Sequence, residues 1–431
     1  MSKLVTSPTA PVMETLRTTA EKLFSDIREL SFDGVGVTRE SYGRRETETG
    51  EYLRAFAVNQ GLTVSTDKAG NFVFSNPDLA PDQPAIWVGS HIDSVPQGGN
   101  FDGLAGVIAG LLCQVGAMHD ISLSSPPLRT IAFRGEESAW FGKAYLGSGA
   151  LFGKISQADL DLVQRDSGQK LDECMKSAGA DLHAIRAGEV LIDKSKVLAY
   201  LELHIEQGPV MIARDLALAA VSGIRGNVRH NRIDCFGDAQ HSGVVPRWLR
   251  HDAMFAVSDL IMRLDAHWKD LLERGTDLVV TTGIVQTDTA EHSISRIPGH
   301  VSFSLEARSR SGDTLEAFYQ LVQAEIQAIS KERGVRFQTD RRLRSEPATM
   351  DPKLCQVLLD ACAARGIAHD IIPSGAGHDA SLFANAGIPS GMLFVRNQNG
   401  SHNPQEAMEM DDFMLGVQAL SDAIHRLGDL A

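Results

Sequence analysis

The sequence lacks the features that tie a chain to a membrane, a nucleic acid or an oxidising compartment. It has no run of about 18 apolar residues, as a membrane span would need, and its first eleven residues contain one lysine and no apolar segment. A formal net charge of −14 argues against a phosphate-backbone partner, because such binding needs clustered lysine and arginine. The five cysteines form no Cys-x-x-Cys pair and are odd in number, which indicates reduced, buried thiols. We therefore expect a cytoplasmic protein that binds neither membranes nor nucleic acid.

Several catalytic motifs are also missing. The sequence contains no Gly-x-Ser-x-Gly elbow for a serine nucleophile and no His-Glu-x-x-His zinc helix. It has no Gly-x-Gly-x-x-Gly turn after a strand, as a dinucleotide site would require. Any catalytic site must therefore be built from other residues.

Length and periodicity predict an α/β protein of two domains. A chain of 431 residues exceeds what one hydrophobic core usually organises. Apolar residues at helical spacing alternate with strand-like runs, which is typical of α/β proteins. The predicted helices are 13–30, 47–60 and 103–118, and the predicted strands are 62–65, 71–75, 85–89, 129–134, 197–203 and 391–395. We expect a mixed sheet flanked by helices, with an active site at the carboxyl ends of the strands.

The pattern changes between about residues 220 and 334. Here the predicted strands are 232–236, 278–285 and 301–307, and the predicted helices are 251–272 and 314–333. Two strand-plus-helix units of this size indicate a smaller α+β domain inserted into the larger one. We therefore predict a catalytic domain at 1–219 and 335–431 and an inserted domain at 220–334.

Residues 89–102, Gly-Ser-His-Ile-Asp-Ser-Val-Pro-Gln-Gly-Gly-Asn-Phe-Asp, are typical of a metal site. Imidazole and carboxylate are the ligands that suit zinc and its first-row neighbours, and a glycine-rich turn lets the backbone bring separated ligands to one ion. His91 and Asp93 point the same way from a strand end, so Asp93 could accept the second ring N–H of His91. Taken singly, His91 also fits a buried core histidine, and Asp102 fits a helix N-cap.

Three further segments supply candidate residues. Glu136 and Glu137 follow a predicted strand, where adjacent carboxylates are often simply solvated. Such a pair can also divide its roles, one carboxylate binding metal while its neighbour, raised in pKa by the like charge, moves protons. His204 interrupts an apolar strand and His402 lies in a glycine-bearing loop, so a satisfied core histidine and an exposed histidine are the alternatives.

Together these segments resemble the binuclear zinc hydrolases of the M20 peptidase superfamily. The resemblance is to the amidase branch of N-carbamoyl-L-amino acid hydrolases, β-ureidopropionases and allantoate amidohydrolases, and it covers nearly the whole chain. Its most specific pieces are Gly-Ser-His91-Ile-Asp93-Ser-Val-Pro, Gly135-Glu136-Glu137 and Leu203-His204-Ile205-Glu206-Gln207-Gly208-Pro209. A histidine at 204, where peptidase members carry a carboxylate, points to the amidase branch.

The resemblance implies two divalent metal ions per subunit. The implied ligands are His91, Asp102 and His204 for one metal and Asp102, Glu137 and His402 for the other, with Asp102 bridging. Zinc is the expected metal, and Mn²⁺, Co²⁺ and Ni²⁺ are alternatives. Glu136 would be the general base that deprotonates a water shared by the two metals, while Asp93 would orient His91.

The resemblance also implies that the inserted domain is a lid that joins two subunits in a homodimer. His241 would be the lid histidine that donates to the oxyanion, in its own or in the partner subunit. A surface-strand histidine is the alternative for that residue.

Substrate recognition is where the sequence departs from the family. Gln207 and Arg308 stand where the family binds the polar end of the substrate, and Arg308 would hold a carboxylate bidentately. Ser295 replaces the usual asparagine, and a hydroxyl cannot offer the same donor and acceptor at the same reach. Gly377 and His378 match a family segment near the substrate, although a hydrogen bond to the adjacent loop explains His378 equally well. The loops 244–247 and 396–400 also differ from the family pattern.

The sequence therefore predicts a metal-dependent amidohydrolase that cleaves a linear C–N bond of a small carboxylate-bearing substrate. The main hypothesis is hydrolysis of an N-carbamoyl (ureido) amino acid to amino acid, ammonia and carbon dioxide. A second hypothesis keeps the mechanism and changes the substrate to an N-acyl or other amide, because of Ser295 and the altered loops. A third hypothesis, a catalytically silent binding protein of the same fold, would be marked by loss of a ligand or of Glu136, and none is lost.

Overall fold

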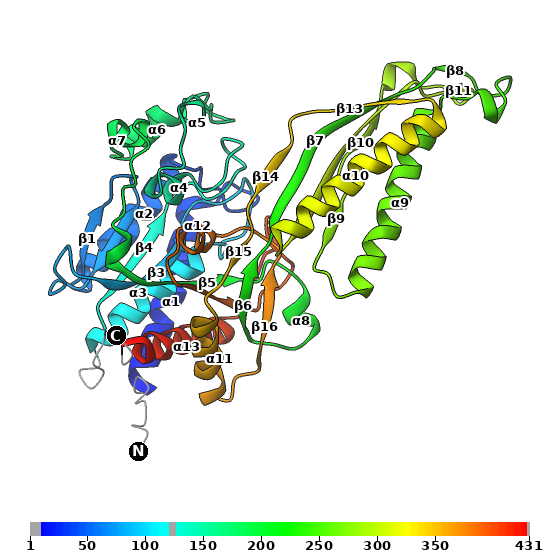
Figure 1. The fold of residues 1–431 in the computed structure, drawn as a ribbon. Helices are drawn as coiled ribbons and strands as arrows, with labels where there is room; N and C mark the ends of the chain where they lie inside the picture. The colour runs from blue at the N-terminus through cyan, green and yellow to red at the C-terminus, as the bar shows by residue number, and fades with distance from the viewer. Residues whose placement is uncertain (1–9, 120–125, 429–431) are drawn as a thin grey trace. The chain divides into compact units, whose positions relative to one another are not determined.

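The computed structural model describes residues 10–119 and 126–428 and divides into two compact units (Figure 1). Unit 1 consists of Met1–Ser222 and Thr349–Ala431, and unit 2 is Gly223–Ala348. The prediction that no export signal is present concerns mainly residues 1–9, which lie outside the described residues.

Unit 1 is a sheet with helices on both faces. Its strands are β1 (Thr63–Thr66), β2 (Phe72–Ser75), β3 (Ala85–His91), β4 (Leu128–Phe133), β5 (Val197–Ile205), β16 (His369–Ser374) and β17 (Ser390–Val395), with β6 (Leu218–Ile224) and β15 (Ala348–Thr349) where the chain leaves and re-enters the unit. Its helices are α1 (Ala10–Ser31), α2 (Arg44–Asn59), α3 (Leu104–His119), α4 (Leu146–Leu151), α5 (Gln157–Leu160), α6 (Leu171–Ser177), α7 (Leu182–Arg186), α8 (Val210–Ala213), α11 (Pro352–Ala364), α12 (Ala380–Asn385) and α13 (Met410–Gly428).

The strand order of this sheet is β1-β2-β4-β3-β5-β17-β6-β15, with β16 also paired to β6. The four central strands β4, β3, β5 and β17 are parallel, whereas β2 and β6 run antiparallel to their neighbours β4 and β17. The sheet is therefore mixed, as predicted. Its parallel centre brings four carboxyl ends to one edge.

The two faces of the sheet hold different interiors. The alternate β5 residues Leu201, Leu203 and Ile205 belong to the large apolar core that includes α1, α3 and α13. On the other face, Tyr200 stacks on Phe383 of α12, with ring centroids 4.1 Å apart. Because strand side chains alternate, Glu202 and His204 share the α12 face with Tyr200.

Unit 2 is a second sheet covered by two long helices. Its elements are β7 (Gly226–Phe236), β8 (Gln240–His241), α9 (Ala253–Glu273), β9 (Val279–Thr281), β10 (Val285–Thr287), β11 (Arg296–Ile297), β12 (His300–Ser309), α10 (Gly312–Arg333), β13 (Arg336–Thr339) and β14 (Leu343–Ser345). The main sheet has the order β10-β12-β7-β13, with β14 on β7 and β9 on β12, while β8 and β11 form a separate pair. Its core contains Phe303 of β12, Leu260 of α9 and Phe318 of α10.

The α9 helix shows why this unit forms. Asp252 caps its N-terminus by accepting the backbone N–H of Phe255 at 3.1 Å. Buried residues then recur at helical spacing, at 253, 256, 257, 260 and 264. The helix therefore turns one apolar face to the sheet, while its outer face is mixed and exposes Phe255 and Met262.

Two sequence predictions about unit 2 were wrong in detail. The predicted end at residue 334 is too early, because β13 and β14 both pair with β7 and the unit continues to Ala348. The predicted strand 278–285 is two short strands, β9 and β10, which pair with different parts of β12.

Within the described part of the chain, no helix is long and apolar enough to span a membrane.

Candidate metal centre and active site

The parallel centre of the unit 1 sheet gathers the predicted metal ligands. β3 ends at His91, β4 is followed by Glu136 and Glu137, and His204 is the penultimate residue of β5. The fourth strand, β17, leads into the loop that carries His402. Because these strands are parallel neighbours, their carboxyl ends bring the side chains together.

Asp102, in the turn before α3, lies at the centre of this group. Its Oδ1 is 3.5 Å from Nε2 of His91 and 3.2 Å from Nε2 of His204. Its Oδ2 is 3.3 Å from Nε2 of His402, which lies 3.2 Å from Oε1 of Glu137. One carboxylate thus faces two donor sets, each of which could hold a metal ion. The N-cap alternative for Asp102 is wrong, since Oδ2 contacts the Gln207 amide and the Ser401 hydroxyl and Oδ1 has no hydrogen-bond partner.

Two of the imidazoles are oriented by their second ring nitrogen. His91 Nδ1 lies 3.1 Å from the backbone oxygen of Asp93 and 3.3 Å from its Oδ1, while His204 Nδ1 lies 2.9 Å from the backbone oxygen of Ile205. An N–H at Nδ1 leaves the Nε2 lone pair for a metal ion. Both rings therefore present Nε2 to Asp102.

Asp93 links the strand end at His91 to the Glu136–Glu137 pair. Its Oδ1 accepts the backbone N–H of Glu136 at 3.0 Å, and its Oδ2 accepts that of Glu137 at 3.1 Å and the hydroxyl of Ser41 at 2.6 Å. The same carboxylate faces His91. Asp93 therefore holds the glutamate pair beside the histidine, a wider role than the sequence predicted.

Burial and neighbouring charges shift the pKa values of these groups in opposite directions. Burial raises the pKa of Glu136 well above its usual range, and the Glu137 charge adds to this effect. Burial opposes the ionisation of Asp102, but the surrounding imidazoles hold its pKa well below its usual range. Contacts with Asp102 and Glu137 raise the pKa of His402 to about 11. In this site the Glu136 carboxyl is therefore suited to hold a proton, whereas the Asp102 carboxyl stays ionised.

The residues present fit a divalent cation. Asp102 Oδ1 and His204 Nε2 are buried and have no hydrogen-bond partner, although they point toward each other. Buried polar atoms without partners are costly, and a cation between them would satisfy both. A third group, Glu202, His204 and His378, also has ligand-type atoms close together. In that group both Glu202 oxygens already accept hydrogen bonds, from the Ser90 hydroxyl and from the Ala380 backbone N–H. The carboxylate of this third group therefore has no oxygen that lacks a partner, unlike that of Asp102.

The structure places the predicted substrate residues of unit 1 near this group. Gln207 donates its Nε2–H to Asp102 Oδ2 at 2.7 Å, and its backbone has a φ of 63°. His378 is buried, contacts Ser374 Oγ through Nε2 at 2.8 Å, and packs edge-on against the ring of His204. Gly377 lies where a Cβ atom would overlap the Tyr145 hydroxyl, so a larger residue there would have to displace the Tyr145 side chain. The loop hydrogen bond considered for His378 is thus present, to Ser374.

The other predicted residues belong to unit 2. His241 of β8 is exposed, and its Nδ1 accepts the backbone N–H of Gly243 at 3.0 Å, which leaves Nε2 as the donor of a neutral ring. The Ser295 backbone oxygen accepts the N–H of Ser242 at 2.7 Å. Arg308 lies on β12, where its Nε donates to Glu306 at 2.9 Å. Each residue is therefore at the surface of unit 2 or partly exposed.

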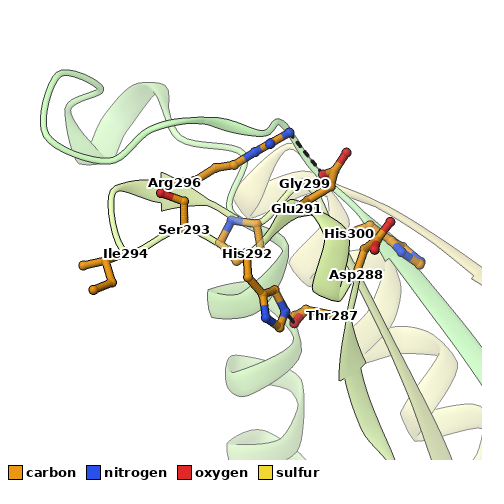
Figure 2. A pocket seen from close by; sticks show the side chains of 10 residues that line it. Thr287, Asp288, Glu291, His292, Ser293, Ile294, Arg296, Gly299 and His300 are labelled. Carbon is orange, nitrogen blue, oxygen red and sulfur yellow. Dashed lines mark hydrogen bonds and ion pairs between the residues drawn. The ribbon is translucent and has the colours of Figure 1, made fainter.

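A cavity of about 440 Å³ is lined by residues that include Ile294 and Arg296, the chain neighbours of Ser295 (Figure 2). Its lining includes His292, whose Nε2 is 2.6 Å from the Thr287 hydroxyl, and Arg296, which pairs with Glu291 at 3.1 Å. Ile294 is fully exposed and extends away from the other labelled side chains. The segment that departs from the family at Ser295 thus lies beside an open cavity with both polar and apolar lining residues.

The arginines at the start of unit 2 are engaged by acidic neighbours. Arg225 pairs with Asp277, and Arg232 donates to Asp234 at 2.9 Å. Arg229 lies 4.0 Å from Glu306. These pairs favour a solvated, charge-balanced face over an anion-binding surface.

Sequence reasoning missed two residues beside the candidate ligands. The Ser401 hydroxyl lies 2.6 Å from Asp102 Oδ2 and 2.5 Å from Glu406 Oε2. Glu406 is buried and accepts the backbone N–H of Asp102 at 3.2 Å. The sequence contained one indication of their roles, since both residues lie within four positions of His402.

A mixed sheet whose parallel strands place histidines and carboxylates around one aspartate defines a metallohydrolase. The family model for peptidase family M20/M25/M40 matches residues 87–426, and the chain belongs to this family.

Relatives match over nearly the whole chain. The chain is 33% identical over 414 residues to an N-carbamoyl-L-amino acid amidohydrolase of Geobacillus stearothermophilus, covering 94% of this chain and 98% of that protein. It is 31% identical over 400 residues to an allantoate amidohydrolase of Bacillus subtilis, covering 92% and 94%. A solved hydantoinase/carbamoylase-family amidase from Burkholderia multivorans matches with a TM-score of 0.83 at 26% identity, covering 96% and 97%. These matches confirm the predicted superfamily, the fold class and an enzyme that hydrolyses carbon–nitrogen bonds in linear amides.

Proposed function

We propose that this protein hydrolyses N-carbamoyl amino acids to amino acid, ammonia and carbon dioxide with two divalent metal ions, preferably zinc. The observation that carries the proposal is the placement of Asp102 between two donor sets, with His91 and His204 on one oxygen and His402 on the other. In this assignment His91, Asp102 and His204 would hold one metal, and Asp102, Glu137 and His402 would hold the second. When bound, the metals would polarise the ureido carbonyl and lower the pKa of a water.

Glu136 is assigned the proton transfers. Its raised pKa suits a group that takes a proton from the attacking water and returns it to the leaving nitrogen. Asp93 accepts the Glu136 backbone N–H at 3.0 Å, which fixes the backbone from which the carboxyl projects. Orientation of this kind keeps a general base within reach of its proton without reorganisation.

The substrate's polar end is assigned to Gln207, Gly377 and His378 in unit 1 and to Arg308 and Ser295 in unit 2. The guanidinium of Arg308 would bind the substrate carboxylate through two parallel N–H donors. Ser295 offers a single hydroxyl, which favours the N-acyl alternative for the substrate. His241 is assigned the second donor to the oxyanion, since its Nδ1 already accepts from Gly243.

The arrangement within unit 2 supports a homodimer. β12 begins at His300, directly after Gly299, whose backbone oxygen accepts the N–H of Gly237 in the segment that leads to β8. Arg308 lies eight positions further along β12. At about 3.4 Å per residue, eight positions span roughly 27 Å, too far for His241 and Arg308 to meet at one small substrate. We therefore assign His241 and Arg308 to the active sites of different subunits.

Complementation of two inactive variants tests this assignment. His241→Ala and Arg308→Ala would each be inactive alone, but half of the dimers in a reassociated equal mixture combine one of each. Each such dimer has one intact site, so the mixture should recover about a quarter of wild-type activity. No recovery after verified subunit exchange would contradict the shared site.

We assign the protein to the cytoplasm on the basis of its cysteines. All five are free and buried in the described structure, which supports a reducing compartment, the cytoplasm.

A substrate screen on zinc-loaded protein tests the function itself. N-carbamoyl amino acids, β-ureido acids, allantoate and N-acyl amino acids would be compared by ammonia and amine release. Glu136→Gln should keep its metals and lose about 100- to 10,000-fold in turnover, while the exposed control Glu51→Gln should not change. Preference for N-acyl substrates would move the assignment to the second hypothesis. Metal binding without turnover of any amide would favour a silent binding protein.

A further inference from the structure

Glu406 is a buried carboxylate that joins two distant segments of unit 1. It is 7% exposed, and its Oε1 accepts the backbone N–H of Phe101 at 2.8 Å and of Asp102 at 3.2 Å. Its Oε2 lies 2.5 Å from the Ser401 hydroxyl, next to His402 in the chain. One side chain thus connects the turn of Asp102 to the loop of His402.

The surrounding backbone is shaped around this carboxylate. A Cβ atom at Gly99 would overlap the Glu406 side chain, so the turn before Asp102 accepts only glycine there. Ala407 exchanges backbone hydrogen bonds with Gln398, at 2.7 and 3.2 Å, and closes the base of the loop. Glu406 therefore lies where the loop is anchored, with its charge turned toward the Asp102 turn.

The candidate histidines differ in how firmly they are held. His91 and His204 are buried at strand ends, and their Nδ1 atoms face backbone oxygens. The His402 side chain is 51% exposed and lies in a loop, at a backbone φ of 60°. The second metal position thus depends on the anchoring of a loop, and the first depends on the sheet.

We propose that Glu406 is a positioning residue that fixes His402 against Asp102 and so sets the occupancy of the second metal position. The first position shares Asp102 but takes His91 and His204 from strand ends, so it should depend on Glu406 less. This inference rests on the proposed pair of metal positions.

Zinc stoichiometry in chelator-buffered solution is the test, measured on the full-length protein. Glu406→Ala should bind one zinc with little change in affinity and the second about 10- to 100-fold more weakly, as expected when a partner of a metal ligand is lost. Glu406→Gln should lie between Glu406→Ala and wild type, because its amide oxygen can still accept the two N–H groups. His402→Ala should show the same selective loss, and the exposed neighbour Gln405→Ala should bind two zinc ions normally.

The outcomes separate the inference from the function on which it rests. If the wild type binds fewer than two zinc ions, the proposed metal pair fails. If the wild type binds two and Glu406→Ala binds both normally, or loses both equally, the positioning role is wrong. Should Glu406→Ala not fold, Glu406→Gln decides: selective weakening of the second zinc supports the role, and two unchanged affinities refute it.

Discussion

In unit 1, the deeply buried carboxyls mostly have raised pKa values, whereas the shifted carboxyls of unit 2 lie near the surface and have lowered ones. Burial raises the pKa of Asp379 to about 8 and that of Glu46 to about 7, the latter against the opposing charge of Arg134. In unit 2, contact with Arg342 lowers the pKa of Glu316 to about 2. Two buried carboxyls of unit 1, Asp93 and Asp102, are exceptions. Their pKa values are lowered because they lie against imidazoles.

This difference shows what each unit is built to hold. A fold that needs only stability does not bury many carboxylates, because each ionised group loses its hydration. Unit 1 does so around a cluster of histidines and unpartnered donor atoms, which is the environment of a cation. Unit 2 pairs its charges at the surface, where ion pairs contribute little, and depends on an apolar core.

The largest expected effect comes from removing the centre of unit 1. Asp102→Ala should abolish activity and release both metals, because the residue faces both donor sets. Metal analysis and hydrogen exchange by segment would measure this, and peptides of unit 2 should keep wild-type protection. A variant that retained both metals would show that Asp102 is not the shared ligand.

Truncating a core residue of unit 2 should destabilise that unit and leave both metals bound. Phe303 is 2% exposed in the core of unit 2, and Phe303→Ala should destabilise that unit by about 3–5 kcal/mol. Zinc content should remain at two per subunit. Loss of zinc in this variant would show that unit 2 supports the metal positions, contrary to the division described above.

The pH dependence of the metal-free protein should also separate the units. The Asp379, Glu46 and Asp67 carboxyls, with pKa values of about 8, 7 and 6, bind protons in the folded state that the unfolded state has released. Stability of unit 1 should therefore fall between pH 5 and 8, by about 1.4 kcal/mol per pH unit for each carboxyl protonated only when folded. The histidines with raised pKa values act in the same direction above pH 6.5.

Unit 2 should not lose stability between pH 5 and 8. Its shifted carboxyls have lowered pKa values, so their contribution is present above the unfolded pKa and is lost only as the pH falls toward about 2. Segment-resolved hydrogen exchange, corrected for intrinsic rates, checks both trends. Parallel pH profiles for the two units would remove this contrast.

The smallest expected effect concerns the α9 cap. Asp252→Ala removes the acceptor for the N–H of Phe255 and should cost about 1 kcal/mol in unit 2. The catalytic constants should not change by more than experimental error. Thermal unfolding followed in both units would detect the cost, and a change confined to unit 1 would contradict it.

Local patterns in the sequence were sufficient to predict the ligand-bearing strands. Apolar runs before His91, Glu136 and His204 predicted buried strands, and parallel pairing then placed their ends together. The roles of Glu406 and of Asp93 toward Glu136 were not predictable, because they depend on hydrogen bonds between segments far apart in the chain.

The end of unit 2 was misplaced for a related reason. Arg336–Thr339 and Leu343–Ser345 are short and largely polar, so neither shows the apolar alternation that predicts a strand. Their identity as strands comes from pairing with β7. The helix end at Gly334, with a φ of 64°, was in contrast visible in the sequence.

Gln207 and His402 both adopt left-handed backbone conformations that glycine would adopt with less strain. A search for thermostable variants that scores backbone conformation alone would rank glycine highly at both positions. Such substitutions would relieve the backbone and remove the side chains that contact Asp102. Selection for durability and selection for catalysis therefore oppose each other at these two residues, and a stabilisation campaign on this enzyme should leave them unchanged.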